Sequence, residues 1–243
     1  MAGLVYAVAM AGRGERFARA GVSVPKYMVE ARGRTLFEHS LASLPFGPGD
    51  KAVFIALREH EEKYGLREFI KGRCRAPWEL LLLPAPTRGQ AETVLAAREL
   101  VPAGAGLAIY NIDTAFRSPG LAARLADPAA RLDGVIGAFK LGREDAKWSF
   151  ARTGPDGTVT ETAEKVQISD NALTGFYHFS RAADFFETAA AAVRGGETSA
   201  GEFYVAPLYN RLIAAGRRFA LDTAETLTPL GTPEDVEVFR RGA

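Results

Sequence analysis

Cysteine is nearly absent from this 243-residue chain, and Cys74 alone cannot form an internal disulfide or a cysteine-based zinc site. Histidine is scarce too, since the three histidines, His39, His60 and His178, show no metal-ligand spacing. An excess of one charge is also missing, because 30 basic residues balance 29 acidic ones to a net +1. This balance excludes a global basic surface for nucleic acid, but it allows a local basic pocket for one anionic ligand.

Long apolar runs are missing as well. No run reaches the roughly 18 to 20 residues that span a bilayer, and residues 1–10 lack the basic start of a signal peptide. Together with the low cysteine content, this predicts a cytoplasmic protein without a membrane partner. The composition, 47% hydrophobic and 24% charged, is typical of a globular chain rather than a disordered one.

Several familiar catalytic and nucleotide-binding motifs are absent. There is no Gly-x-Ser-x-Gly elbow, no Cys–His nucleophile pattern and no Gly-Lys-Ser/Thr of a Walker A loop. The dinucleotide fingerprint needs a third glycine where Phe17 stands, a helix that begins at once, and an acid where Leu57-Arg58 ends the second strand pattern. Residues 21–24, Gly-Val-Ser-Val, indicate an extended loop instead of such a helix.

The first half of the chain contains an alternation of short apolar runs and helical patterns. The apolar runs predict buried parallel strands at residues 4–10, 52–57, 80–83 and 107–112. Helical patterns lie between them at residues 34–44, 59–71 and 90–100. This order predicts an α/β fold, a Rossmann-like mixed central sheet with helices on both faces.

The second half is richer in strand patterns. Strands are expected at residues 134–140, 148–152, 158–160 and 173–179, with a turn at 153–157. An amphipathic helix follows from Val205, and a last helix has Thr232 as its N-cap and Pro233 as its first residue. We expect one domain over residues 1–243, with halves of about 1–115 and 116–243, the second of which carries a β-rich insertion.

A glycine-rich loop follows the first strand pattern. It reads Ala-Gly-Arg-Gly-Glu-Arg-Phe over residues 11–17, and Pro25-Lys26 comes ten residues after Arg16. Glycines let the backbone approach an anion closely, so that successive N–H groups can bind phosphate oxygens. Arg16 can donate a fork of hydrogen bonds to a phosphate and Lys26 supplies a point charge. The alternative is a tight turn with two solvated cations.

This loop resembles the signature of sugar-nucleotide pyrophosphorylases and related nucleotidyltransferases, Gly-x-Gly-x-Arg-Phe followed by Pro-Lys. Further motifs resemble that family in the same order along nearly the whole chain. They are Thr-Arg-Gly-Gln-Ala at 87–91 with Thr-Val-Leu at 93–95, Asn-Ile-Asp at 111–113, Glu-Lys at 164–165, Thr-Gly-Phe-Tyr at 174–177 and Gly-Thr-Pro-Glu-Asp at 231–235. The resemblance implies a GT-A-like nucleotidyltransferase fold with the β-rich insertion on the acceptor side.

The resemblance also implies the reaction, which is transfer of a nucleoside monophosphate from an NTP to a phosphorylated acceptor with release of pyrophosphate. Both substrates are anions, so catalysis needs positioning and positive charge more than an acid or a base. The implied catalytic residues are Arg16 on the β- and γ-phosphates, Lys26 on the α-phosphate or the acceptor, and Lys165 on the acceptor phosphate. The implied binding residues are Ala9, Ala11, Gly12, Gly14, Gly89, Gln90 and Asn111 for the nucleotide, Glu164 and Gly175 for the acceptor, and Asp113 for Mg²⁺.

The sequence limits the candidate NTPs and acceptors only in part. Gly89 would let a base edge approach the backbone, and the Gln90 amide can offer a donor and an acceptor, which favours a pyrimidine NTP: UTP, CTP or dTTP. The closest resemblance is to short enzymes of capsule or surface-polysaccharide supply, which points to a sugar 1-phosphate as the acceptor. A non-sugar phosphate and a homo-oligomer both stay open.

The metal motif departs from the resemblance. Many members of the family carry a second metal-binding aspartate just before Gly-Thr-Pro, and here Pro229 stands in that place. Either Asp222 supplies the missing carboxylate, or Asp113 holds Mg²⁺ together with substrate phosphates and waters. The second explanation is preferred, because magnesium needs only one or two carboxylates beside phosphate ligands.

Other interpretations of the same residues exist. A metal-dependent GT-A glycosyltransferase shares the fold, but such enzymes usually carry Asp-x-Asp, and Asn111-Ile112-Asp113 has only the second acid. A nucleotide-binding homologue without chemistry is a second alternative. Taken singly, Asp113 could be a loop cap and Lys165 a solvated strand residue. Glu202 is a further candidate acid for the acceptor site.

Overall fold

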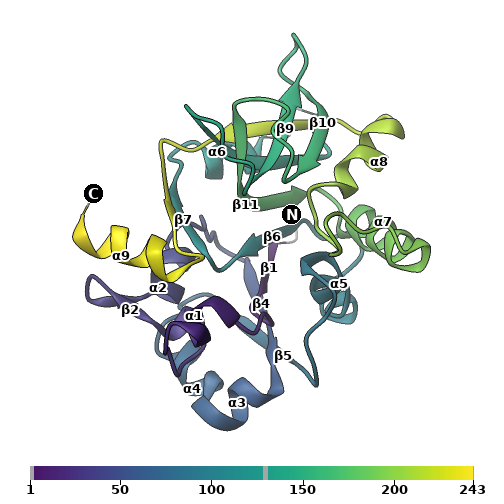
Figure 1. Cartoon of the computed structure of the whole chain (residues 1–243). Coiled ribbons are helices and arrows are strands. Elements are labelled where there is room, and N and C mark those ends of the chain that lie inside the picture. Colours follow the sequence, from purple (N-terminus) through teal and green to yellow (C-terminus); the bar gives the residue numbers. More distant parts are fainter. Residues whose placement is uncertain (1–2, 128–130, 243) are drawn as a thin grey trace.

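Within residues 3–127 and 131–242, which a computed structural model describes, nine strands form one mixed sheet (Figure 1). Four parallel neighbours make its centre, in the order β6 (Leu107–Asn111), β1 (Val5–Ala9), β4 (Lys51–Leu57) and β5 (Trp78–Leu83). These are the four apolar runs of the sequence. A parallel strand covered on both faces needs apolar side chains on both, which explains the unbroken runs.

The second half of the chain extends this sheet mainly with antiparallel pairing, and only β12 pairs parallel, with β8, within the described residues. β11 (Asn171–Phe179) lies antiparallel beside β6, and the sheet then forks. One branch holds β9 (Ser149–Thr153) and β10 (Val159–Glu164), and the other holds β8 (Gly134–Lys140) and β12 (Phe219–Thr223). The predicted mixed Rossmann-like sheet is therefore confirmed.

Helices cover both faces of the sheet, as predicted. Val5 and Ala7 of β1 pack into one buried cluster, whereas the alternate residues Tyr6 and Val8 pack into the other. The first cluster takes side chains from α5 (Gln90–Leu95), α7 (Ala182–Gly195) and α8 (Leu208–Ala214). The second takes them from α2 (Leu36–Leu41), α4 (Leu66–Lys71) and α6 (Leu121–Ala126).

Some helix boundaries differ from the prediction. The expected helix 59–71 is two helices, α3 (Arg58–Tyr64) and α4, because Gly65 between them has a left-handed φ of 62°. The expected helix 90–100 ends at Leu95, and only a 3₁₀ turn follows at Arg98–Leu100. Helix α7, with 14 residues, was not predicted at all.

The C-terminal helix α9 (Pro233–Arg241) lies against the segment that follows the glycine-rich loop (Figure 1). It begins as predicted, since the Thr232 hydroxyl accepts a hydrogen bond from the Asp235 N–H at 3.1 Å. Val236 of α9 shares a small buried cluster with Phe17 and Leu36. The short β2 (Glu30–Ala31) and β3 (Arg34–Thr35) form a hairpin beside it. The end of the chain thus stabilises the loop after β1.

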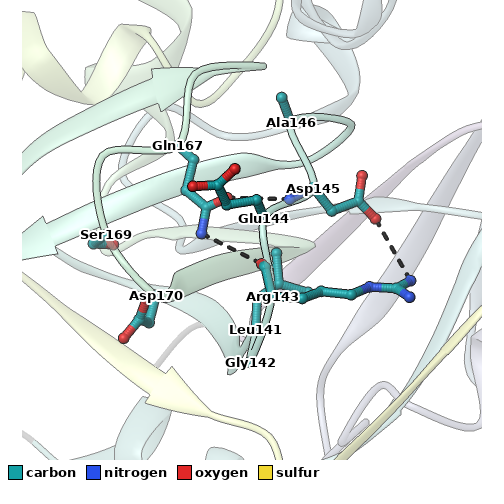
Figure 2. Close-up of a pocket in the computed structure, with 9 residues that line it drawn as sticks. All are labelled: Leu141, Gly142, Arg143, Glu144, Asp145, Ala146, Gln167, Ser169 and Asp170. Atoms are coloured by element: carbon teal, nitrogen blue, oxygen red, sulfur yellow. Dashed lines mark hydrogen bonds and ion pairs between the residues drawn. The ribbon is translucent and has the colours of Figure 1, made fainter.

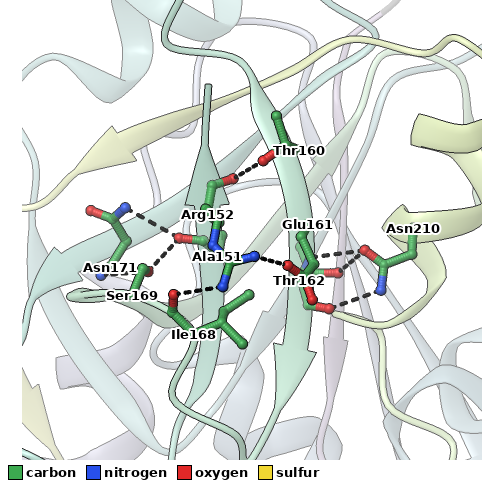
Figure 3. A network of polar contacts seen from close by, with 9 residues as sticks. All are labelled: Ala151, Arg152, Thr160, Glu161, Thr162, Ile168, Ser169, Asn171 and Asn210. Carbon is green, nitrogen blue, oxygen red and sulfur yellow. Dashed lines mark hydrogen bonds and ion pairs between the residues drawn. The ribbon is translucent and has the colours of Figure 1, made fainter. Parts of the chain in front are cut away.

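A polar network ties the β9–β10 pair to α8 (Figure 3). The Thr162 N–H donates to Asn210 Oδ1 at 2.8 Å, and Asn210 Nδ2 donates back to the Thr162 carbonyl at 2.8 Å. The Thr162 hydroxyl also donates to the Ala206 carbonyl at 2.6 Å. Because β10 ends at Glu164, this network fixes the strand that carries the Glu164-Lys165 pair.

The last pairing is small but lies beside the candidate site. β7 (Thr114–Arg117) follows Asp113 directly and pairs antiparallel with β13 (Thr226–Pro229). Neither strand was predicted from the sequence. Over the two described ranges, no helix has both the length and the apolar character that crossing a membrane requires.

Candidate active site

Two cavities meet at the carboxyl ends of β1 and β6. The first chamber has a volume of about 490 Å³ and the second about 370 Å³. Residues common to both linings are Gln90, Asn111, Asp113, Glu202 and Tyr204. The carboxyl ends of parallel strands are where ligands bind in open α/β sheets, so this double cavity is the candidate active site.

The first chamber is formed by the glycine-rich loop on one side and the loop before α5 on the other. Nine of the residues predicted for the site line it: Ala9, Ala11, Gly12, Gly14, Lys26, Gly89, Gln90, Asn111 and Asp113. Arg13, which the sequence analysis did not single out, lines it as well. The signal for Arg13 was its place inside the glycine-rich motif.

One expectation about this loop was wrong. A short helix, α1 (Glu15–Arg19), does begin at once, because Gly14 takes the left-handed conformation with φ 63° and turns the chain into it. The helix has only five residues, and the extended loop starts after it. Arg13 and Arg16 consequently diverge: Arg13 lines the first chamber, and the exposed Arg16 lines the second.

The second chamber contains the remaining predicted residues, Glu164, Lys165 and Gly175, in addition to Arg16. Sequence reasoning missed Lys147, Trp148 and Ser149, which also line it, as do Tyr177 and Asp235, which it placed in family motifs without a site role. They come from β9, β11, α9 and the loop before β9, which are far apart in the chain. Only the tertiary fold brings them together.

Asp113 and Lys26 form an ion pair at the junction of the chambers, with Lys26 Nζ 3.1 Å from Asp113 Oδ2. The Asp113 carbonyl accepts a hydrogen bond from the Leu230 N–H at 2.8 Å, which holds the Gly-Thr-Pro segment against it. Pro229 pairs with Thr114 in the β7–β13 ladder and lines the second chamber. The residue in the position of the missing aspartate therefore lies beside Asp113.

Asp222 is placed differently. Its side chain is buried, accepts a hydrogen bond from Ser118 Oγ at 2.5 Å and lies 3.5 Å from Arg124 Nε. It lines neither chamber. Among the residues that the structure describes, no three His, Cys, Asp or Glu side chains are grouped for a metal ion.

A glycine in the lining of the second chamber lies against Asn111. Gly175 of β11 has φ 86°, and a Cβ at this position would lie 2.9 Å from Asn111 Nδ2. Asn111 in turn accepts a hydrogen bond from Gln90 Nε2. A larger residue at 175 would displace Asn111, so the predicted glycine has a steric reason.

Glu164 and Lys165 have distinct environments although they are neighbours. The Ser149 hydroxyl donates to Glu164, yet burial dominates and raises the pKa of that carboxyl above its ordinary value. Lys165 Nζ donates to the Tyr204 hydroxyl at 2.7 Å, and this hydrogen bond is the main reason that the pKa of Lys165 is raised. Lys165 therefore stays cationic at neutral pH.

Comparison with known proteins identifies the family. No protein-family model matches the chain, and no curated protein does. The solved structure of a nucleoside-diphosphate-sugar pyrophosphorylase from Vibrio cholerae RC9 is 34% identical over 97% of this chain and 99% of its own, with a TM-score of 0.82. The chain belongs to the nucleoside-diphosphate-sugar pyrophosphorylase family. The family resemblance of the motifs is thereby confirmed.

Solved structures of lower sequence identity share the fold. A protein from Bacillus anthracis described as a glucose-1-phosphate thymidylyltransferase is 14% identical over 98% of this chain and 94% of its own, with a TM-score of 0.78. The inositol-1-phosphate CTP transferase from T. maritima is 15% identical over 100% of this chain and 98% of its own, with a TM-score of 0.75. At these identities the likeness concerns the fold alone.

A larger open groove lies elsewhere on the surface, between residues 141–146 and 167–170 (Figure 2). Its volume is about 770 Å³, but it contains none of the predicted site residues. Asp145 in this groove is paired with two cations, since its Oδ2 lies 3.9 Å from Arg143 Nη2 and 3.7 Å from Lys147 Nζ. The family motifs converge on the two chambers instead, so size does not identify the active site here.

Proposed function

We propose that this protein transfers a nucleoside monophosphate from a pyrimidine NTP to a sugar 1-phosphate and releases pyrophosphate. One observation carries the proposal: two chambers, one beside the glycine-rich loop and one beside Glu164-Lys165, meet at the Lys26–Asp113 ion pair. A transfer between two anions needs such a meeting point, with a binding site on each side and positive charge between them.

In this proposal the first chamber holds the NTP. The backbone of the glycine-rich loop, Arg13 and Lys26 face the triphosphate, while Gly89 and Gln90 face the base. An oxygen of the acceptor phosphate attacks the α-phosphorus, a new P–O bond forms, and the bond to the bridging oxygen of the β-phosphate breaks. Pyrophosphate leaves with that electron pair. Lys26 stabilises the charge that develops between the two chambers.

The second chamber holds the acceptor. Lys165 binds its phosphate, and Glu164 accepts hydrogen bonds from its hydroxyl groups. Arg16 lines this second chamber, whereas the NTP would lie in the first. Its assigned role on the β- and γ-phosphates therefore requires its flexible side chain to reach across Gly14. Alternatively Arg16 binds the acceptor phosphate, and the kinetics of Arg16→Ala distinguish these roles.

Asp113 fits a magnesium site of one carboxylate. One of its oxygens is paired with Lys26 and the side chain remains about one-third exposed (30%), which leaves room for an ion bound jointly with nucleotide phosphates. Magnesium would supply neutralisation of phosphate charge there. Because Lys26 already neutralises Asp113, the protein without nucleotide should bind Mg²⁺ weakly.

The pyrimidine preference is supported by the loop before α5. Gln90 is oriented by its hydrogen bond to Asn111, and Thr87 and Thr93 add hydroxyls to the chamber. Two of the solved structures with the same fold are of a protein described as a thymidylyltransferase and of a CTP transferase, and both names refer to pyrimidine nucleotides. In the cell, the product would be a nucleotide sugar for capsule or surface-polysaccharide synthesis, made in the cytoplasm.

The decisive experiment is a pyrophosphate-release assay with UTP, CTP, dTTP, GTP and ATP against a panel of sugar 1-phosphates and non-sugar phosphates, with Mg²⁺. Turnover should require a pyrimidine NTP and a sugar 1-phosphate. Lys26→Met should lose turnover, whereas the matched control Lys71→Met, an exposed helix residue paired only with Glu68, should keep it.

Each alternative predicts a different outcome. Preference for GTP or ATP would contradict the base assignment. Sugar transfer from a nucleotide sugar without pyrophosphate release would indicate a glycosyltransferase. NTP binding without turnover for every acceptor would indicate a binding-only homologue.

A further inference from the structure

The segment 199–204 is shared by both chambers. It starts with a tight turn in which Ser199 and Glu202 exchange backbone hydrogen bonds of 2.9 and 3.0 Å. The two central residues, Ala200 and Gly201, have φ values of 48° and 83°, as a primed hairpin turn requires. Beyond the turn, Glu202 and Tyr204 line both chambers. This segment is therefore a physical link between the two binding sites.

Phe203 anchors this segment to the loop of the first chamber. Its N–H donates to the Arg88 carbonyl at 2.9 Å, and its carbonyl accepts from the Ala91 N–H at 2.8 Å. Gly89 lies between these two bonds, so close that a Cβ there would be 2.5 Å from the Phe203 nitrogen. We call this contact of residues 88–91 with Phe203 the loop clamp. It fixes the backbone next to Tyr204 relative to the nucleotide side.

Tyr204 connects the loop clamp to the acceptor side. Its hydroxyl accepts the hydrogen bond from Lys165 Nζ at 2.7 Å, and the ammonium lies 4.9 Å from the centroid of the ring. Glu164 and Glu202 are the other charged groups that act on this ammonium. Lys165 has an exposed, flexible side chain, so without Tyr204 the ammonium would sample many positions.

We propose that Tyr204 is a positioning residue that holds the Lys165 ammonium in the second chamber. The loop clamp fixes the backbone beside Tyr204, so the position of the ammonium is set from the nucleotide side. The catalytic importance of Tyr204 rests on the proposed function, in which Lys165 binds the acceptor phosphate. The structural part does not rest on it, because the hydrogen bond exists in the protein without substrates.

The first test needs no substrate. Lysines react with acetic anhydride only in the neutral form, so the acetylation rate of Lys165 measured by mass spectrometry against pH reports its pKa, with Lys71 as an internal reference. Tyr204→Phe keeps the ring but removes the acceptor oxygen, so the Lys165 curve should move to lower pH. Tyr6→Phe, whose hydroxyl donates to the Pro45 carbonyl away from both chambers, should leave the curve in place. An unchanged Lys165 curve in Tyr204→Phe would overturn the proposal.

The second test uses the NTP and sugar 1-phosphate that turn over fastest in the panel above. Tyr204→Phe should lower kcat/KM for the acceptor about fivefold, a modest loss because the hydrogen bond is exposed, and KM for the NTP should stay unchanged. In a Lys165→Met background, Tyr204→Phe should have no further effect. A further loss in that background, or an equal rise in KM for the NTP, would mean that Tyr204 acts otherwise.

The two failures are distinguishable. If no pair in the panel turns over, the proposed function fails, while the acetylation curve still decides whether Tyr204 holds Lys165. If turnover occurs and the curve does not move, only the positioning role fails.

Discussion

Gly89→Ala tests the loop clamp directly. Gly89 has φ 145° and ψ 173°, a conformation that is accessible in practice only to glycine. An added Cβ would lie 2.5 Å from the nitrogen and 2.6 Å from the carbonyl oxygen of Phe203. Both atoms belong to backbone that is hydrogen-bonded to residues 88 and 91, so neither can move away without breaking the clamp.

The expected magnitude follows from these contacts. The backbone conformation costs an alanine about 1–3 kcal/mol, and each of the two hydrogen bonds is worth about 1 kcal/mol. If the loop moves to relieve the clash, the hydrogen bonds are lost, and if it stays, the strain remains. Either outcome costs about 2 kcal/mol, so we expect the free energy of unfolding to fall by about 2 kcal/mol, which a domain of ordinary stability survives. KM for the NTP should rise as well, because Gln90 moves with the loop.

Urea unfolding and pyrophosphate release measure the two effects on one preparation. Gly142→Ala is the matched control, since its φ is not left-handed and nothing lies within 4 Å of the added Cβ. That variant should change the unfolding free energy by less than about 0.5 kcal/mol. If Gly89→Ala is as stable as Gly142→Ala and keeps the wild-type KM, the clamp does not constrain the loop.

Three further predictions concern other parts of the molecule. Asp113→Asn should abolish turnover, whereas Asp222→Asn should leave it largely intact because Asp222 lines neither chamber. Calorimetry that finds tight Mg²⁺ binding without nucleotide would argue against a metal site with one carboxylate. Arg16→Ala should lower kcat/KM about 100-fold or more, the usual cost of one charged transition-state contact, and a wild-type rate would remove its catalytic role. Burial lowers the pKa of His178 from 6.5 to about 4, so on acidification the unfolded chain binds a proton at this histidine before the folded chain does. The free energy of unfolding should therefore fall by about 3 kcal/mol for this group as the pH falls from 6.5 towards 4. In His178→Gln, the urea midpoint should depend less on pH over that range.

The central fold could be predicted because its strands carry their signal locally. The runs at 4–10, 52–57 and 107–112 are short and apolar on both faces, and such runs are typical of strands in a covered parallel sheet. Helix α7 escaped prediction because its alanine-rich middle, residues 189–192, has no strong periodic contrast. The β7–β13 pair escaped because each strand has only four residues and is defined by a distant partner: Arg117 pairs with Thr226 and Thr114 with Pro229.

In the candidate site, too, some residues have a local signal in the sequence and others depend on the tertiary fold. Arg16, Lys26 and Asp113 belong to short motifs that the sequence displays, so they could be named without a structure. Arg13 lay inside such a motif, yet only the turn at Gly14 shows which arginine faces which chamber. Tyr204 belongs to an aromatic stretch of the sequence whose helical spacing favours a core role, so nothing local pointed to Lys165. Its relation to Lys165 spans 39 residues and depends on the loop clamp, which is a tertiary contact.

Gly175 has a consequence for how acceptor range can evolve in this protein. It lines the second chamber, and Asn111 lies so close that this position cannot acquire a side chain. If this chamber holds the acceptor as proposed, β11 is a fixed boundary of the acceptor site in any descendant that keeps Asn111. New acceptors must be accommodated from the rim, where Lys147, Trp148 and Tyr204 stand on loops or at strand ends. Libraries aimed at a different acceptor should vary these rim positions and leave residue 175 unchanged.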